Sequence, residues 1–296
     1  MKESLCLMAE KKYGIKPDPD DVEKLKKHLL ENSARDSLYN NLYTDDKSFE
    51  RIFTSGEAAA FLTVNETYFF REPHHFFLLL DLLSSLNQSS IRICSAAASS
   101  GCEAYSIAML LETYNKTAEK KLSYQIDAFD INPNMIEKAR NGIYSQRSLR
   151  EDGSCFNFIT DYYLNKKNDK IIVEYDFKNN INFFVHNVLN ELKFDYYDII
   201  FFRNAFIYFL PDYREKVLTN LSNALKEKGF LIMGISETSG VKHHHLEQKI
   251  KHLQTQNEDV FFFQKNSYQK PAAHPSGRSI EAPDYFINTL PEKSAV

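Results

Sequence analysis

From residue 91 onward, short apolar runs alternate with helical stretches, and this alternation constrains the fold more than any other feature of the sequence. IRICS (91–95), YQIDAFD (124–130), YYDIIFF (196–202) and FLIMGIS (230–236) have the length and composition of buried strands, and VFFFQK (260–265) predicts a last one. Helical patterns occupy 102–115, then 133–141 between Pro133 and Gly142, and 212–229 up to Gly229. Strands that alternate with helices form a mostly parallel sheet covered on both faces, so the sequence predicts an α/β fold.

The first 60 residues follow a helical pattern instead, and we expect them to form a separate helical domain. SFERIFTSGEAAAFL predicts a helix that breaks near Gly56, and HFFLLLDLLSSL (75–86) predicts a buried helix because it is apolar on nearly every face. Four apolar residues recur at helical spacing in DPDDVEKLKKHLL: Val22, Leu25, Leu29 and Leu30.

Two further segments depart from the strand–helix alternation. Residues 143–182 are polar and aromatic, and KIIVEYDFKNNINFF within them alternates, which predicts a small inserted antiparallel β-subdomain in a domain spanning 61–265. Residues 266–296 contain four of the nine prolines and no apolar period, so we expect a flexible tail. For His243–His245 we favour a solvated loop over a metal site.

Composition excludes several classes of function. The 36 basic and 40 acidic residues give a net charge of −4, which leaves no basic field to attract nucleic acid. No apolar run has the length of a membrane span or of a signal peptide. The four cysteines show no metal-ligand spacing, and no heptad pattern indicates self-association. We therefore expect a reduced, cytoplasmic, monomeric protein that neither binds a metal nor enters the membrane.

Two polar features occur where the first two strands end. The loop Ser95–Gly101 has only small side chains, so a ligand can approach the backbone at a helix N-terminus; a tight strand–helix turn is the alternative. Asp130 ends the second strand, where a carboxylate can accept hydrogen bonds from both hydroxyls of a ribose. Capping of the next helix is a compatible second role for it. The two-residue period directs Asp127 away from the strand tip.

Two other segments combine charge with apolar surroundings. Arg203 and Asn204 end a buried strand at the carboxyl edge of the predicted sheet, where ligands bind in open α/β sheets. Arg71 lies between aromatic residues in NETYFFREP and has the planar shape that clamps a carboxylate. Taken alone, that segment also has the composition of an amphipathic hinge.

Together these segments resemble the CheR family, the chemotaxis receptor methyltransferases that use S-adenosylmethionine. The resemblance runs from about residue 60 to 265. It rests on NETYFFREP, RICSAAASSGCEAYSIAMLL, DAFDINPNMIEKARNGIYS, HNVL, FFRNAFIYF and GISET. It implies a class I S-adenosylmethionine-dependent methyltransferase sheet, which is Rossmann-like, a helical N-terminal domain at 1–60 and an inserted β-subdomain that can touch the receptor.

The resemblance also implies a set of site residues for S-adenosylmethionine and its product S-adenosylhomocysteine. Arg71 and Tyr208 would be catalytic, with Tyr208 near the transferred methyl group. Glu103 and Asp130 would hold the methionine and ribose portions, and Asn187 and Val188 would flank the adenine. The cofactor-binding set as a whole would be Asn65, Thr67, Arg71, Ala97, Gly101, Glu103, Asp130, Asn187, Val188, Arg203 and Asn204.

Three departures from the family pattern concern mainly the partner. The cofactor loop continues Gly101-Cys102-Glu103-Ala104 where members usually have Gly-Glu-Glu-Pro. The N-terminal zone has Arg35 and Arg51 where members carry several arginines proposed to meet the receptor. The insertion lacks the glycine-bearing loop of members that bind a receptor's C-terminal peptide, so we expect docking that does not depend on that peptide.

The implied reaction forms a methyl ester on a glutamate side chain in the cytoplasmic domain of a methyl-accepting chemotaxis receptor. A glutamate with a pKa of about 4.3 is already ionised at neutral pH, so the reaction needs no general base. We accordingly assign the histidines at 74, 75 and 186 to packing or the surface. The alternatives are a methyltransferase for another carboxylate and a non-catalytic module that senses S-adenosylmethionine or S-adenosylhomocysteine.

Overall fold

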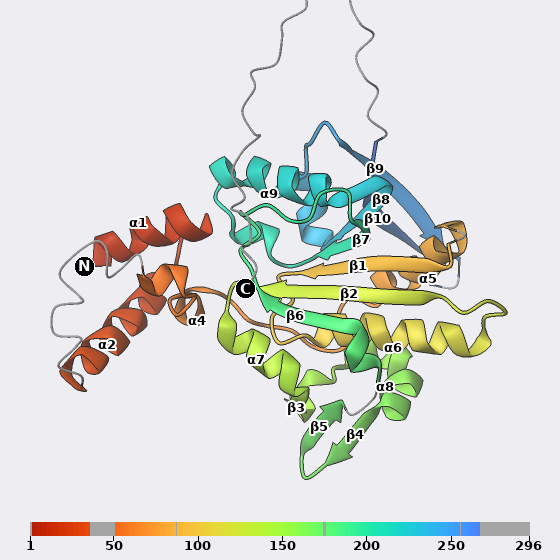
Figure 1. The fold of residues 1–296 in the computed structure, drawn as a ribbon, viewed down its shortest axis with the longest axis horizontal. Helices are drawn as coiled ribbons and strands as arrows, with labels where there is room; N and C mark the ends of the chain where they lie inside the picture. Colours follow the sequence, from red (N-terminus) through yellow and green to blue (C-terminus); the bar gives the residue numbers. More distant parts are fainter. Residues whose placement is uncertain (1, 36–50, 87, 174–175, 255, 267–296) are drawn as a thin grey trace, which may run out of the picture.

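The computed structural model of the protein describes residues 2–35, 51–86, 88–173, 176–254 and 256–266, arranged around a seven-stranded sheet (Figure 1). β10 (Glu258–Lys265) runs antiparallel to both of its neighbours, whereas the five strands from β6 (Ile181–Val185) to β8 (Leu225–Met233) are parallel. This confirms the predicted α/β class. The strand order across the sheet is β6 (Ile181–Val185), β2 (Ser123–Asp130), β1 (Ser90–Ala96), β7 (Tyr197–Phe202), β8 (Leu225–Met233), β10 (Glu258–Lys265) and β9 (Leu246–Leu253).

Both faces of the central part of the sheet are buried, and the alternation of side chains along β7 shows how. Ile199 and Phe201 belong to the apolar cluster beneath α5 and α6, whereas Ile200 and Phe202 belong to the cluster beneath α9. Figure 1 shows α6 and α7 on one side of the sheet and α9 on the other. These four helices are α5 (His74–Leu86), α6 (Cys102–Thr117), α7 (Pro133–Asn141) and α9 (Pro211–Ala224).

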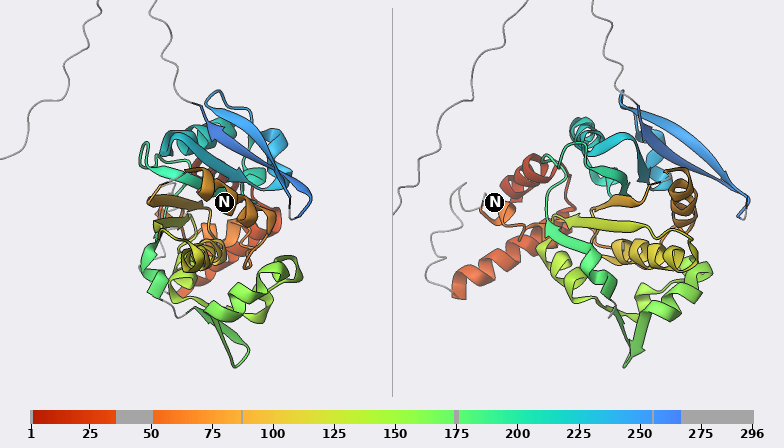
Figure 2. Two further views of the ribbon diagram at one scale, coloured as in Figure 1. Left: turned by 90° about the vertical axis from the view of Figure 1, so that its right-hand side faces the viewer. Right: turned by 45° about the vertical axis from the view of Figure 1, so that its right-hand side comes forward.

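The N-terminal helices α1 (Lys2–Tyr13), α2 (Pro19–Arg35) and α4 (Ala59–Leu62) have a hydrophobic cluster of their own. They lie beyond the carboxyl ends of β1 and β2 (Figures 1 and 2). The break at Gly56 is confirmed, because its φ of +80° is the left-handed conformation that glycine adopts readily. The helix predicted around Val22, Leu25, Leu29 and Leu30 is confirmed as α2; the first three are buried, whereas Leu30 is 47% exposed.

The inserted unit contains α8 (Asn157–Tyr163) and a second, antiparallel sheet ordered β3 (Ile143–Ser145), β5 (Lys170–Val173) and β4 (Leu164–Lys167). It projects from the α6 side of the main sheet (Figure 2). The strand INFF, which we expected within it, instead forms part of β6 and pairs in parallel with β2. Tertiary packing decides this, because Ile181 and Phe183 are buried in the main core.

Three predictions near the C-terminal end need correction. The helix predicted to reach Gly229 ends at Ala224, and Leu225 already pairs with Tyr197 in the sheet. β9 was not predicted because its charged sequence LEQKIKHL lacks an apolar run, as suits the edge of a sheet. His243 is buried rather than solvated, and its Nδ1 accepts the amide of His245. The expected tail beyond Asn266 lies outside the described residues.

None of the helices described is both long and apolar enough to cross a membrane.

Candidate functional site

A cavity of about 500 Å³ lies where the carboxyl ends of the parallel strands face the N-terminal helices. Its wall is built from residues 13–21, from the segment 62–71 and from the loops that follow β1, β2, β6 and β7. All but one of the site residues predicted from the sequence line it. They are Asn65, Thr67, Arg71, Ala97, Glu103, Asp130, Asn187, Val188, Arg203, Asn204 and Tyr208.

Gly101 is the exception, because it does not line the cavity. It precedes α6 with a φ of +86°, and a Cβ atom there would lie 2.8 Å from the Cβ of Ala139 and 3.0 Å from the ring of Phe183. Real Cβ atoms do not approach each other so closely. Gly101 therefore allows the start of α6 to pack against α7 and β6.

The loop after β1 forms part of the cavity wall through its backbone. Ala97 and Ser99 have φ values of +58° and +49°, an unusual conformation for residues other than glycine. Both line the cavity together with Ala98, whose amide donates to the carbonyl of Phe129. The loop is thus a tight turn whose residues line the cavity, and its contact with a ligand stays a prediction.

Asp130 joins this loop to the end of β2. Its Oδ2 accepts the amide of Ser99 at 2.8 Å and its Oδ1 accepts the amide of Asn132 at 2.9 Å. Burial raises the pKa of Asp130 above its usual value, while these amides act in the opposite direction. A carboxylate has about four acceptor positions, so capacity for further hydrogen bonds remains. Asn132, not Asp130, caps α7 by accepting the amide of Asn134 at 3.0 Å.

Asp127 points away from the cavity, as the two-residue period predicts. It accepts hydrogen bonds from the hydroxyl of Tyr197 at 2.9 Å and from the amide side chain of Asn182 at 3.0 Å. These bonds connect β2 with β7 and β6. Asp127 therefore connects strands of the sheet, whereas Asp130 lines the cavity.

Glu103 and Arg203 form a buried pair in the cavity wall. Arg203 Nη1 lies 3.4 Å from Glu103 Oε2, and Glu103 Oε1 accepts the hydroxyl of Ser95 at 2.7 Å. Burial raises the pKa of Glu103, and the guanidinium of Arg203 partly offsets that rise. Arg203 also donates from Nη2 to the backbone carbonyl of Arg71. The pair thereby connects α6, the end of β7 and the 62–71 segment.

The sequence analysis missed two glutamates that hold Asn204. Glu72 Oε1 accepts the side-chain amide of Asn204 at 2.8 Å, and Glu237 Oε2 accepts its backbone amide at 2.7 Å. Glu237 also accepts the amides of Ile207 at 3.2 Å and Gly234 at 3.0 Å. Both acids occur within the motifs FFREP and GISET, so a charged residue in a mostly apolar or small-residue motif was the available signal.

Arg71 lies at the mouth of the cavity beside an aromatic ring, as expected. Its guanidinium is 5.5 Å from the ring centre of Tyr68, and its Nη1 donates to the carbonyl of Glu66 at 2.9 Å. The inserted unit contributes Arg150, which lies 4.3 Å from the same ring and pairs with the carboxylate of Glu66 at 2.7 Å. Tyr208 is 42% exposed at this mouth.

The N-terminal domain contributes another part of the cavity wall. Asn187 donates to the carbonyl of Lys12 at 2.7 Å, and the amide of Leu210 donates to the carbonyl of Gly14 at 2.8 Å. As a result Ile15 and its neighbours line the cavity, a contribution that the sequence did not predict. His186 also lines it, with its ring packed 5.1 Å from that of Phe129.

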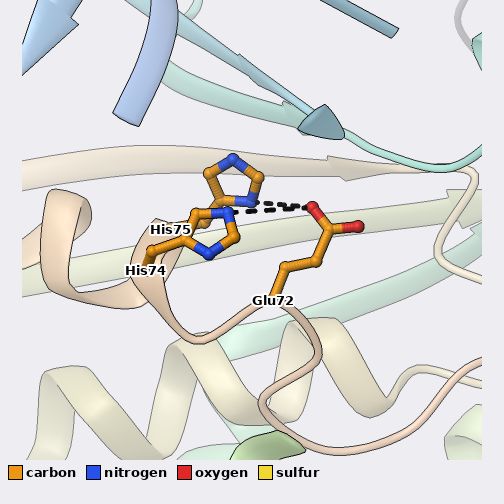
Figure 3. Close-up of side chains that lie close together, drawn as sticks. All are labelled: Glu72, His74 and His75. Carbon is orange, nitrogen blue, oxygen red and sulfur yellow. Dashed lines mark ion pairs between the residues drawn. The ribbon is translucent and has the colours of Figure 1, made fainter. Parts of the chain in front are cut away.

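His74 and His75 lie behind the cavity wall, where both face Glu72 (Figure 3). His75 Nδ1 is 3.3 Å and His74 Nε2 is 4.0 Å from Glu72 Oε2. Burial lowers the pKa of both histidines and so favours their neutral forms. Neither reaches the cavity, in keeping with the packing role assigned to them.

The cavity wall suits a nucleoside that carries a charged amino-acid portion. Its volume falls within the range of small-molecule sites. Asp130 offers acceptors for hydroxyl groups, Glu103 offers a buried negative charge, and Arg71 offers a cation for a carboxylate. This donor and acceptor set fits S-adenosylmethionine.

Comparison with known proteins gives a consistent result. The family model described as CheR methyltransferase, SAM binding domain, matches residues 65–256. The chemotaxis protein methyltransferase of Vibrio parahaemolyticus is 36% identical over 182 residues, which cover 60% of this chain and 66% of that protein. The chemotaxis protein methyltransferase 1 of Vibrio cholerae is 35% identical over the same shares.

The chemotaxis protein methyltransferase of Escherichia coli is 33% identical over 244 residues, which cover 75% of this chain and 81% of that protein. The matched part of the chain thus spans just under two thirds of the length of the Vibrio relatives.

Proposed function

Because the chain belongs to the CheR methyltransferase family, we propose that it transfers a methyl group from S-adenosylmethionine to glutamate side chains of chemotaxis receptors, forming methyl esters. The matched domain is the S-adenosylmethionine-binding domain of that family. The observation that carries the proposal is the cavity: residues from five of the six motifs converge on one space at the carboxyl edge of the sheet.

Each part of the wall has a role in this proposal. Asp130 accepts the ribose hydroxyls, Glu103 faces the methionine portion, and Asn187 with Val188 borders the adenine. Asn65, Thr67, Ala97, Arg203 and Asn204 complete the cofactor site. When bound, S-adenosylmethionine supplies a methyl group activated by its positively charged sulfur. Gly101 is left out, because it packs against Ala139 outside the wall.

In the proposed reaction these residues orient the reactants and do not act as acids or bases. The acceptor glutamate is ionised at neutral pH, so no group needs to remove a proton. Holding a nucleophile in line with its target can contribute up to about 7–11 kcal/mol in favourable cases. A water-excluding site also helps, because water stabilises the separated charges that the reaction neutralises.

Arg71 and Tyr208 are the residues we assign to the reacting centre, since both lie at the mouth of the cavity. Arg71 orients a carboxylate, either that of the acceptor or that of the cofactor. Tyr208 packs beside the methyl donor. The acceptor glutamate belongs to the cytoplasmic domain of a receptor, so the protein acts in the cytoplasm.

The test is transfer of labelled methyl groups from S-adenosylmethionine to a purified cytoplasmic receptor fragment by the full chain. A methyl ester on glutamate releases methanol in base, and replacing the acceptor glutamates with alanine abolishes labelling. We expect Arg71→Ala and Tyr208→Phe to lower the rate. Arg92→Ala is the matched control, because Arg92 also lies on a tyrosine ring, 4.4 Å from that of Tyr196, but outside the cavity.

Other outcomes separate the alternatives. Wild-type rates in both variants would remove Arg71 and Tyr208 from the reacting centre. Labelling of a cell extract but not of the receptor would indicate another carboxylate substrate. Binding of S-adenosylhomocysteine without turnover on any acceptor would indicate a sensing module.

A further inference from the structure

Behind the cavity wall, the carboxylate of Glu72 is surrounded by polar groups from two other elements. From the end of β7 it meets Asn204 Nδ2 at 2.8 Å and Arg203 Nη2 at 3.9 Å. From the start of α5 it meets His75 and His74 (Figure 3). We call these five residues the Glu72 cluster. Glu72 itself does not line the cavity, whereas Arg203 and Asn204 do.

The cluster is unusual in how many buried polar atoms lack a hydrogen bond. Among the described residues, seven buried side-chain nitrogen or oxygen atoms have no such partner. Five of them belong to this cluster: Glu72 Oε2, His74 Nε2, His75 Nδ1, Arg203 Nε and Arg203 Nη1. Buried polar groups are normally satisfied by hydrogen bonds, so the position of the two charged members, Glu72 and Arg203, calls for an electrostatic explanation.

A metal ion is the first occupant to consider, because one ligand atom from each of Glu72, His74 and His75 lies within 4.8 Å of the others. Arg203 argues against it. The guanidinium is always protonated and lies 3.9 Å from the same Oε2 atom that a metal would take. A divalent cation there would face a permanent cation and remove its counter-charge. The cation whose charge Glu72 balances is therefore Arg203.

Arg203 has two acidic partners, and they differ in one respect. Glu103, at 3.4 Å, lines the cavity, whereas Glu72 lies behind it. In the proposed function Glu103 faces the cofactor, so the positively charged cofactor competes with Arg203 for the carboxylate of Glu103. The side chain of Arg203 is only 2% exposed, and a buried guanidinium without a counter-charge is strongly unfavourable. A second carboxylate is needed that does not line the cavity, and Glu72 meets this condition.

We propose that Glu72 is a positioning residue that remains the counter-charge of Arg203, and anchors Asn204, when the cofactor occupies the cavity. The two carboxylate oxygens divide these tasks: Oε2 faces Arg203 and Oε1 accepts from Asn204. Glu72 thereby keeps both residues in the wall without touching the ligand. The inference rests on the proposed function only through the binding of the cofactor.

The backbone around Glu72 is itself held in place, as a positioning role requires. Glu72 has a φ of +55° and Phe70 a φ of +53°, so the segment turns sharply on either side of Arg71. The amide of Glu72 donates to Asp152 Oδ2 at 3.1 Å, and the amide of Phe70 donates to Ser106 Oγ at 2.9 Å. The carboxylate is thus presented from a fixed turn.

The experiment measures the affinity of the full chain for S-adenosylhomocysteine by calorimetry. Glu72→Gln keeps the length of the side chain and an acceptor for Asn204 but removes the charge. We expect at least a tenfold higher Kd. Glu258→Gln is the matched control: its carboxylate lies 4.0 Å from His74 Nδ1 on the outer side of the cluster, and its Kd should stay within twofold of the wild type.

A double-mutant cycle separates positioning from a general loss of structure. If Glu72 acts through Arg203, Glu72→Gln changes the Kd by less than twofold in an Arg203→Met background. A further tenfold loss in that background, or a wild-type Kd for Glu72→Gln, overturns the proposal. Thermal melting checks that each variant is folded.

Should Glu72→Gln not fold, Glu72→Asp is the substitute variant. It retains a charge farther from Arg203 and is expected to raise the Kd three- to tenfold; an unchanged Kd counts against the proposal.

Two further measurements complete the binding experiment. A chelator should leave the wild-type Kd unchanged; weaker binding that zinc restores would place a metal in the cluster and overturn the proposal. Absence of S-adenosylhomocysteine binding by the wild type would instead overturn the cofactor assignment, so the two failures are distinguishable.

Discussion

The backbone amide of Ser99 donates to the carboxylate of Asp130 at 2.8 Å, which ties the loop after β1 to the end of β2. These two features are separate candidates in the sequence and a single unit in the fold. The carboxylate that shapes the loop is also the one we assign to the cofactor ribose. Loss of Asp130 should therefore affect both the shape of the loop and the contact with the ribose.

Replacing Asp130 with asparagine should weaken the binding of S-adenosylhomocysteine about 10- to 100-fold. Hydrogen bonds to a charged group contribute about 1.5–3 kcal/mol, and the asparagine amide also places a donor where an acceptor is needed. Calorimetric titration measures the change. Asp127→Asn provides the contrast, because Asp127 bonds to Tyr197 within the sheet: it should lower the unfolding temperature and leave the affinity unchanged. Equal affinities for wild type and Asp130→Asn would exclude the ribose role.

The affinity for S-adenosylhomocysteine should fall in acid at a higher pH than an aspartate of ordinary pKa would give. Burial raises the pKa of Asp130, and only its ionised form accepts both hydroxyls. Affinity is therefore full above this raised pKa and is lost as the pH falls through it, by at most about tenfold per pH unit for one proton. Titrations over a pH series should show a shallower dependence in Asp130→Asn. The same slope in both proteins would assign the effect to another group.

Gly101→Ala should destabilise the fold by roughly 2–4 kcal/mol, because a left-handed φ and an overpacked Cβ both disfavour alanine there. The added methyl would lie 2.8 Å from the Cβ of Ala139. Urea denaturation gives the free energy of unfolding. Adding Ala139→Gly should recover part of the loss, since it removes the facing methyl. Affinity for S-adenosylhomocysteine should persist in the folded variant, and a selective loss of binding without destabilisation would return Gly101 to the cofactor site.

Glu237→Ala should destabilise the protein by roughly 3–5 kcal/mol, because three backbone amides lose their acceptor. These amides belong to Asn204, Gly234 and Ile207. Glu237→Gln should cost less, since one carbonyl oxygen remains. Denaturant unfolding of the two variants and the wild type gives this order directly. A Glu237→Ala protein as stable as the wild type would show that other groups hold the loop after β7.

Sequence patterns predicted the central parallel strands β2, β1, β7 and β8 well because these strands are largely buried on both faces. The apolar runs around Ile93, Ile126 and Ile200 are therefore continuous and easily recognised. β9 escaped prediction because its outward side chains are charged. INFF (181–184) was assigned to the wrong sheet because nothing local distinguishes an inserted strand from an edge strand.

The residues of the candidate site likewise fall into those that the sequence predicted and those that it did not. Residues at the ends of strands, such as Asp130 and Asn204, were predictable because parallel strands bring their carboxyl ends to one edge. The roles of Glu72 and Glu237 were not, since each acts on Asn204 through contacts 132 or 33 residues apart in the sequence. The resemblance also placed Gly101 in the site, whereas its close approach to Ala139 needs the packed helices to be seen.

By itself, the sequence determined the alternation of strands and helices, the burial of the central strands and the polar residues that end them, because these depend on local periodicity and on the loss of apolar surface to water. Only the tertiary structure decided that Arg203 pairs with Glu72 and Glu103 and that residues 13–21 line the cavity. Such contacts join groups distant in the chain, and electrostatic and hydrogen-bonding energies depend on distances that no local pattern contains.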